Sequence, residues 1–187
     1  MFHSKERVRT GLHSFAARAM ANTNRRVAMS EANKALVRRW VEEIFNANRV
    51  ELAAEVVAAD YVEHAMATFG NEAPGLVDGP AHIRATFDFL RAQFPDARMV
   101  IEAIAAEQDV VSVRVLATGT NLGPLNGMIP PTGRTFRVQQ SHWFRVADGR
   151  IAEHWATRDD LSAMLQLGVI PRPGPPAARP DGNGAGS

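Results

Sequence analysis

The densest group of chemically capable side chains lies between residues 142 and 160, in the stretch HWFRVADGRIAEHWATRDD. It holds two of the six histidines and two of the three tryptophans of the chain, together with several acids. A carboxylate in an apolar cavity becomes a better proton acceptor near neutral pH, because loss of hydration raises its pKa. The stretch therefore indicates either a wet surface or a cavity in which acid–base chemistry takes place.

Other kinds of site fit the sequence less well. The histidines from position 64 onward lie far apart and lack metal-motif spacing, so no metal site is expected. The chain has no cysteine, which excludes thiol nucleophiles and thiolate metal sites. Ser141 adjoins His142, but neighbours in a strand point to opposite faces, which argues against a Ser–His nucleophile. No glycine-rich phosphate loop follows a strand.

Strand pairing decides which of these side chains share a face. Asp148-Gly149 between two β-like runs predicts a hairpin with a two-residue loop. In a regular hairpin His142 would pair with Trp155, and cross-strand partners share a face. The predicted inner face comprises Val138, Gln140, His142, Phe144, Val146, Ile151, Glu153, Trp155, Thr157 and Asp159. The predicted outer face carries Trp143, His154, Arg158 and further arginines, and a one-residue bulge would exchange the faces of one strand.

The same side chains also have structural interpretations. A lone histidine such as His142 on an apolar face is often a hydrogen-bonded core residue, and Trp155 more often fills space than stacks on a ligand. Asp159 could merely cap the final helix, as could Asp160, because aspartate is a favoured N-cap residue. Arg114, in the run VSVRVLA, either lines the cavity or reaches solvent.

The composition bounds the kind of protein that positions these groups. The 187 residues are 45% hydrophobic and 22% charged, which suits one domain with one core. A net charge of +1 argues against nucleic acid as a partner, and no apolar run approaches the roughly 20 residues of a membrane span. The lack of cysteine suits a cytoplasmic protein.

The two ends differ from the middle of the chain. Residues 1–29 are rich in Arg and Ser, which indicates either a mitochondrial transit peptide or, as we favour, a poorly structured extension. We place the folded domain at residues 30–171. Residues 172–187 are dense in Pro and Gly and are expected to be disordered.

Within the domain, helices come first and strands follow. The pattern predicts an amphipathic helix at 30–48 with Ser30 or Asn33 as N-cap, a short helix and strand ending at His64, a loop at 68–80, and a helix capped by Asp78. Two hairpins then cover 98–120 and 135–159, and a short helix ends at Gly168. This order is typical of an α+β fold, in which helices pack on the concave side of a curved antiparallel sheet and enclose a pocket.

Three stretches, GTNLGPLNGMIPPTGRTF, FRVADGRIAEHW and DDLSAMLQLG, together resemble the SnoaL-like polyketide cyclases, also called ester cyclases. The resemblance covers about residues 33–170 and implies the cone-shaped α+β fold of the nuclear transport factor 2 superfamily. It also implies a cofactor-free intramolecular aldol condensation of a small hydrophobic carbonyl compound. An aspartate would remove a proton alpha to a carbonyl, and the pocket would stabilise the enolate.

The resemblance assigns roles to particular residues. The acid four residues after the family tryptophan matches Asp159, which we predict to be the general acid/base. His142 and Gln140 would hydrogen-bond the enolate oxygen. The further predicted substrate-binding residues are His64 at the pocket mouth, Trp40 and Trp155 as apolar walls, and Arg114.

The chain departs from the family pattern at three positions. Many relatives have histidine at the position of Asn121 and asparagine at that of Ala65, and others have an acid at the position of Ala156. If the last position holds the base in the true cyclases, this chain lacks it.

These observations leave several functions open. The first is a cofactor-free enzyme that abstracts a proton from a small, mostly apolar carbonyl compound. The second is another enzyme on the same fold, an isomerase, dehydratase or epoxide hydrolase, the last of which needs arginine in the cavity. The third is a non-catalytic ligand-binding module, which a cavity without carboxylates would indicate. Trp143 beside Ala152 and Ala156 on an arginine-rich face predicts a homodimer.

Overall fold

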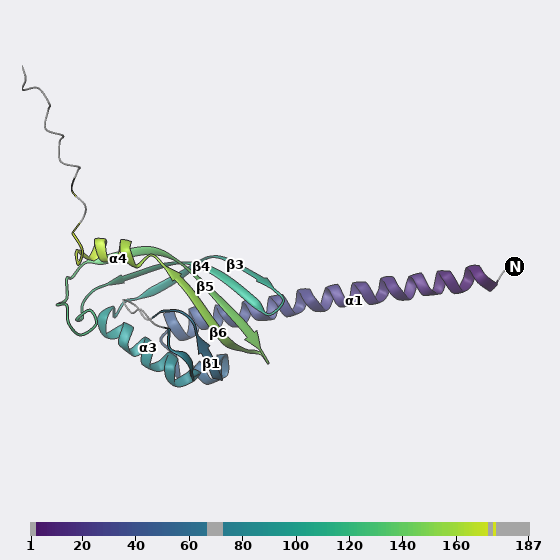
Figure 1. Ribbon diagram of the computed structural model, residues 1–187, viewed down its shortest axis with the longest axis horizontal. Helices are drawn as coiled ribbons and strands as arrows, with labels where there is room; N and C mark the ends of the chain where they lie inside the picture. The colour runs from purple at the N-terminus through teal and green to yellow at the C-terminus, as the bar shows by residue number, and fades with distance from the viewer. Residues whose placement is uncertain (1–2, 67–72, 172–173, 175–187) are drawn as a thin grey trace, which may run out of the picture.

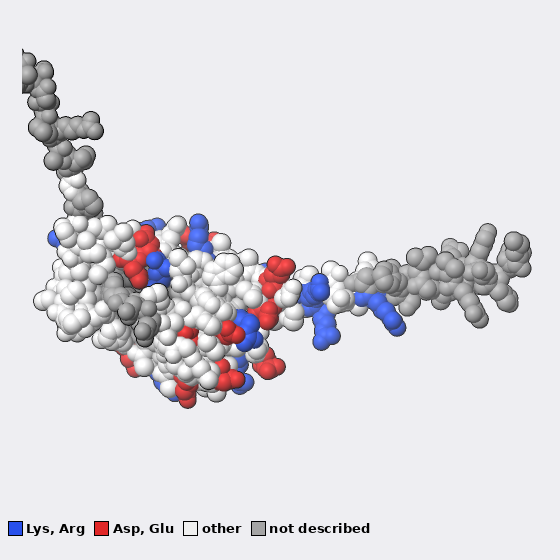
Figure 2. All heavy atoms as spheres, in the orientation of Figure 1, with Lys and Arg blue, Asp and Glu red and all other residues white. Residues whose placement is uncertain are grey.

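The computed structural model describes residues 3–66, 73–171 and 174, and its first element is a long helix. Helix α1 (His3–Arg39) continues into the π-helical segment η1 (Trp40–Asn46), and its first part projects from the body (Figure 1). Figure 2 shows basic side chains on the part of the projecting helix next to the body. The segment predicted to be poorly structured is therefore helical from His3, in keeping with its content of Ala, Arg and Met. The domain boundary near residue 30 stays a prediction.

The helix caps agree with the sequence except at the first helix. Ser30 and Asn33 lie inside α1, so the predicted N-caps are wrong, and the Asn33 amide instead donates to the Gln108 carbonyl at 3.1 Å. Segments η2 (Val50–Leu52) and α2 (Ala53–Val56) follow. Helix α3 (Gly79–Gln93) is capped by Asp78, as predicted. Helix α4 (Asp160–Leu167) ends at Gly168, whose φ of 74° confirms the expected left-handed residue.

One six-stranded sheet forms the other layer. Its strands are β1 (Val57–Glu63), β2 (Gly75–Asp78), β3 (Arg98–Glu107), β4 (Val110–Thr120), β5 (Thr135–Ala147) and β6 (Arg150–Arg158), in the order β2-β1-β6-β5-β4-β3. Strand β2 lies in the predicted loop and pairs with β1, a short strand that the sequence did not reveal. Strands β1 and β6 pair in parallel, whereas all other neighbours are antiparallel.

A bulge in the second hairpin changes the predicted faces. The turn is the expected two-residue loop: Asp148 and Gly149 have φ of 49° and 72°, and Ala147 pairs with Arg150. Val146 then pairs with Ile151 but Arg145 pairs with Glu153, so Ala152 is an extra residue. Beyond it the predicted register is wrong by one residue.

The new register pairs His142 with Ala156 and Trp143 with Trp155. It brings His154 to the inner face and moves Glu153 and Trp155 to the outer face, because successive residues of a strand alternate.

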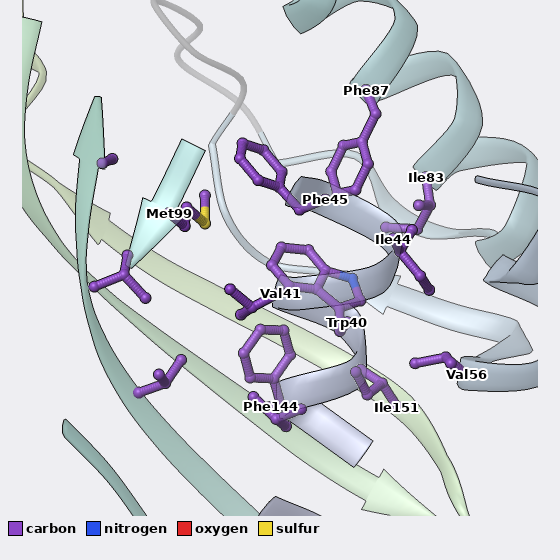
Figure 3. Packing of buried hydrophobic residues seen from close by; sticks show 14 of the residues in the cluster. Trp40, Val41, Ile44, Phe45, Val56, Ile83, Phe87, Met99, Phe144 and Ile151 are labelled. Atoms are coloured by element: carbon purple, nitrogen blue, oxygen red, sulfur yellow. The ribbon is translucent and has the colours of Figure 1, made fainter. Parts of the chain in front are cut away.

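The core lies between the sheet and the helices, with Trp40 at its centre (Figure 3). The Trp40 ring centroid is 5.2 Å from that of Phe144 on β5 and 5.5 Å from that of Phe87 on α3. Phe45 packs edge-on against Phe87 at 5.1 Å. The helix layer is thereby joined to the sheet through aromatic contacts, and the space left beside them forms the cavity described next.

Candidate active site

A cavity of about 410 Å³ lies between the inner face of the sheet and the helices. Most of its walls are apolar, and they include Trp40, Phe45, Ile83, Phe87, Leu90, Phe94, Met99, Ala117, Val138 and Leu167. The polar side chains among the lining residues are Glu63, His82, Thr86, Gln93, Arg98, Thr118, Gln140, His142, His154, Arg158 and Asp160. A few polar groups in an apolar cavity of this size are typical of a small-molecule site.

Four of the polar side chains form one hydrogen-bonded chain across three strands. Gln140 Oε1 lies 3.1 Å from His142 Nε2, and His142 Nδ1 lies 2.9 Å from His154 Nε2. His154 Nδ1 in turn lies 2.9 Å from Glu63 Oε1. The chain runs from β5 through β6 to β1, and both histidines are buried. The two imidazoles therefore contact each other where they are largely shielded from bulk solvent.

Glu63 is held as a carboxylate at the inner end of this chain. Burial by itself would raise the pKa of this carboxyl, but hydrogen bonds with His154 and His82 and from the Ala65 amide hold it well below its usual range. The Tyr61 hydroxyl donates to Glu63 Oε2 at 3.0 Å. Burial, together with the charge of Glu63, raises the pKa of Tyr61, so its hydroxyl keeps its proton. Glu63 thus supplies a fixed negative charge beside His154.

Whereas Glu63 is held in its charged form, the surroundings of His142 favour its neutral form. Its burial lowers the pKa of the imidazole well below the usual value, and the nearby positive charges of His154 and Arg158 act in the same direction. The rings of His142 and His154 lie nearly parallel, with centroids 5.2 Å apart. A positive charge is therefore disfavoured on His142 itself.

Arg158 and Asp160 form an ion pair on the cavity wall. Arg158 Nε lies 3.4 Å from Asp160 Oδ1, and Arg158 Nη2 donates to the Met66 carbonyl at 2.7 Å. Arg158 was predicted to face outward. That prediction is wrong, because the bulge pairs Arg158 with Gln140 on the inner face.

The predicted site residues fall into two groups. His142, Gln140 and Trp40 line the cavity, as predicted. Trp155 lies on the outer face, where its ring stacks on His64 at 4.3 Å between centroids, and His64 Nε2 is 2.7 Å from Glu153 Oε2. Neither Trp155 nor His64 lines the cavity, so the pocket position predicted for each is wrong.

Asp159 and Arg114 also lie outside the cavity walls. The exposed Asp159 carboxylate accepts a hydrogen bond from the Ser162 amide at 3.0 Å, and its hydrogen bonds with Ser162 lower the pKa of Asp159. This is the capping alternative considered from the sequence. The exposed Arg114 pairs with Glu102 on the outer face, with Nε 3.2 Å from Oε2. The geometry gives no support to the acid/base role predicted for Asp159.

Sequence reasoning missed Glu63, His82 and His154 as cavity residues. Glu63 shares a strand face with the buried Tyr61, because residues two apart in a strand point the same way. His82 lies one position before the buried Ile83 of α3, at the edge of the buried face. His154 was hidden by the bulge, for which the sequence carries no clear mark.

Two negative findings apply to the residues with described structure. Among them, no group of three or more His, Cys, Asp or Glu side chains is arranged to hold a metal ion. No helix among them has a stretch long and apolar enough to cross a membrane.

The sheet and the helices together enclose a mostly apolar cavity that several titratable groups line. This arrangement is typical of small α+β proteins that hold a small molecule between sheet and helices. Residues 35–167 match the family model described as SnoaL-like polyketide cyclase. Because that match covers most of the chain, the protein belongs to the SnoaL-like polyketide cyclase family, with the cone fold of the nuclear transport factor 2 superfamily.

Individual relatives agree with this assignment. The chain is 32% identical over 147 residues to aklanonic acid methyl ester cyclase DauD of Streptomyces sp. (strain C5), covering 78% of this chain and 86% of DauD. It is 31% identical over 125 residues to nogalonic acid methyl ester cyclase of Streptomyces nogalater, covering 66% of this chain and 89% of that cyclase. The crystal structure of IdmH from Streptomyces antibioticus superposes with a TM-score of 0.63 at 33% identity, covering 73% of this chain and 98% of IdmH.

Proposed function

We propose that this protein is an ester cyclase that closes a ring of a polycyclic aromatic polyketide ester by intramolecular aldol condensation. The observation that carries the proposal is the apolar cavity with His142 and Gln140 on its wall. An extended aromatic substrate fits the apolar walls, and the adjoining polar groups Gln140, His142 and His154 fit its reacting carbonyl groups. The names of the curated relatives, cyclases of aklanonic and nogalonic acid methyl esters, support the same class of substrate.

The reaction needs only proton transfer and a place for negative charge. A base removes a proton from a carbon alpha to one carbonyl, and the C–H electron pair forms an enolate. The enolate carbon then attacks a second carbonyl carbon of the same molecule, and the resulting alkoxide takes the proton back to become a hydroxyl. No atom is lost, so the product is an isomer of the substrate. Hydrogen bonds to the enolate oxygen lower the barrier because they meet charge that develops in the transition state.

The structure gives less support to the other functions. Epoxide opening by an Asp-Arg-Asp cluster would need more than the single Arg158–Asp160 pair, and Arg114, the second arginine considered, lies on the outer face. A pure binding module was expected to lack carboxylates in its cavity, whereas Glu63 and Asp160 line this one. No specific observation favours either function over cyclisation.

Turnover of the relatives' named substrates tests the proposal. The purified chain is incubated separately with aklanonic acid methyl ester and nogalonic acid methyl ester, and the mixture is followed by liquid chromatography with mass detection and by NMR. We expect a product of unchanged mass with one carbonyl replaced by a tertiary alcohol carbon. Absence of any isomer from both esters, with folded protein and saturating substrate, would contradict an ester cyclase of this class.

We also propose that the outer face of the sheet is the contact between two copies of the chain. Trp143 is 48% exposed and pairs across the strands with Trp155, so a large aromatic surface faces solvent in one copy. Trp143→Glu should convert a dimer to a monomer in sedimentation while the helical signal stays unchanged; a dimer in both proteins would contradict this interface.

A cytoplasmic location remains a prediction, checked by cell fractionation.

A further inference from the structure

The carboxylates that line the cavity are all engaged with other protein groups. Among the described residues that line it, the only carboxylates are Glu63 and Asp160. Asp160 is paired with Arg158, and Glu63 is covered by Tyr61, the Ala65 amide and His154. The residue opposite His142 on β6 is Ala156, which has no functional group. A carboxylate free to contact a substrate carbon is therefore not found among these residues.

Two proton arrangements satisfy the hydrogen bonds of the buried chain without a positive charge on His142. Glu63 is an acceptor only, so His154 Nδ1 must carry a proton and donate to it in both. In the first arrangement His142 Nδ1–H donates to His154 Nε2, and the Gln140 amide NH₂ donates to His142 Nε2. In the second, His154 is protonated on both nitrogens and donates to His142 Nδ1, while His142 Nε2–H donates to Gln140 Oε1.

The two arrangements differ by a single proton. The proton enters at His142 Nε2, on the cavity side, and the proton of His142 Nδ1 passes to His154 Nε2. The added positive charge thereby appears on His154, beside the Glu63 carboxylate, and not on His142. Gln140 turns its amide over in the same step and changes from donor to acceptor toward His142.

We propose that Glu63, His154 and His142 act as a proton relay that serves as the general acid/base of this protein, with His142 as the group that meets the substrate. This inference rests on the proposed function. In the reaction, His142 Nε2 takes the proton from the alpha carbon. The turned Gln140 amide then accepts from His142 Nε2–H through Oε1, and its NH₂ group donates to the enolate oxygen. The relay then returns the proton to the alkoxide. His154 and Glu63 act through His142 and are positioning residues.

The surroundings of the relay explain where its charge is held. The groups that face it are Tyr61 and Glu63 from β1, His82 from α3, Arg158 from β6 and Gln140 from β5, with the Trp40 ring of η1 against both histidines. Burial and Arg158 oppose a charge on His142, whereas Glu63 favours one on His154. A proton taken up at the cavity is thus stabilised about one ring farther from the substrate.

An NMR titration of the wild-type chain tests the relay without any substrate. Histidine ring nitrogens are labelled with ¹⁵N, and the protonation state of each ring is followed from pH 5 to pH 9. We expect His154 to carry a proton on Nδ1 throughout, and the uptake of one proton to change the signals of both rings with one shared midpoint. Two independent titrations, or a neutral His154 protonated only on Nε2, would overturn the relay.

Glu63→Gln tests the catalytic consequence, with Glu153→Gln as the matched control. Glu153 also accepts from a histidine, His64 at 2.7 Å, but does so outside the cavity. Loss of the Glu63 charge should lower the pKa of His142 further, because that charge acts to raise it. The acid limb of the pH–rate profile should therefore move to lower pH, while kcat falls about 100-fold with little change in KM. Glu153→Gln should leave the acid limb, kcat and KM unchanged.

The outcomes separate this inference from the proposed function. If neither ester is turned over, the cyclase proposal fails and the ¹⁵N titration alone decides the relay. If the wild type is active and Glu63→Gln keeps its rate and profile, the relay is wrong although the function stands. Circular dichroism shows whether Glu63→Gln is misfolded. If it is, the pH–rate profile of His154→Asn is measured instead. An acid limb that does not move in that variant counts against the relay.

Discussion

Replacing Glu63 with glutamine has a consequence for stability that the hydrogen bonds of this residue predict. Its carboxylate accepts from Tyr61 Oη at 3.0 Å and from the Ala65 amide at 2.8 Å, and it pairs with His154. Glutamine keeps the volume and one acceptor oxygen but removes the charge and places an NH₂ group toward these donors. Removing one partner of a buried pair costs about 3 kcal/mol of unfolding free energy near neutral pH.

The difference between the two proteins should depend on pH with a definite sign. The pKa of Glu63 is lower in the folded chain than its ordinary value of 4.5, because hydrogen bonds from its partners outweigh the effect of burial. The contribution of the Glu63 carboxylate to the free energy of unfolding is fully present above pH 4.5. It is lost as the pH falls toward the pKa of Glu63 in the folded chain. The wild-type advantage should therefore shrink by up to about 1.4 kcal/mol per pH unit below 4.5. At pH 3.5 roughly half of it should remain.

Urea unfolding at pH 7, 5.5, 4.5 and 3.5, followed by circular dichroism, measures this difference. Glu153→Gln is the control, because Glu153 also has a lowered pKa but lies on the outer face. The free energies of unfolding of wild type and Glu63→Gln are compared at each pH. A difference that stays the same from pH 7 to 3.5 would refute the account of Glu63 as a buried carboxylate held by its donors.

Three further substitutions test separate parts of the structure. Gly79→Ala would place a Cβ 2.2 Å from the Ala58 carbonyl oxygen, so helix α3 must move away from β1, and thermal unfolding should show a loss of about 2–3 kcal/mol. Ala156→Asp would put a carboxylate opposite His142 and should raise the pKa of that imidazole, as read from its ring NMR signals; an unshifted titration would show that position 156 does not face it. Asp159→Asn keeps a capping oxygen, so its exposed position predicts ester turnover within about twofold of wild type, whereas a loss of 100-fold would restore the role predicted from the sequence.

Local signals in the sequence identified most elements of the fold. Asp78 and Gly168 mark helix ends for physical reasons that act within a few residues, and Asp148-Gly149 fixes a turn because both residues adopt positive φ. Strand β2 and the parallel pairing of β1 with β6 were not predicted. Both depend on contacts between segments distant in the sequence, and β2 has only four residues in a stretch rich in turn-forming types.

The candidate site was predicted only in part, because its residues come from strands whose register the sequence does not state. His142 and Gln140 were placed correctly, since β5 is regular along its pairing with β4. Everything predicted on β6 from Glu153 onward was displaced by one residue. Asp159 shows the same limit in another form: a favourable helix cap and a catalytic acid have the same residue type, and only the structure distinguishes them.

The bulge at Ala152 does more than correct a prediction, because it decides which chemistry the inner face has. With regular pairing, Trp155 would lie opposite His142 and His154 would face outward, so the inner face would have no second imidazole. A register shift also interrupts the pairing of β1 with β6, between Val57 and Val62, and after it Glu63 is paired with His154. The two irregularities together place a carboxylate, an imidazole and a second imidazole side by side on three adjacent strands. The extra residues therefore account for the alignment of the proposed relay, and a homologous chain without them would need its base at another position.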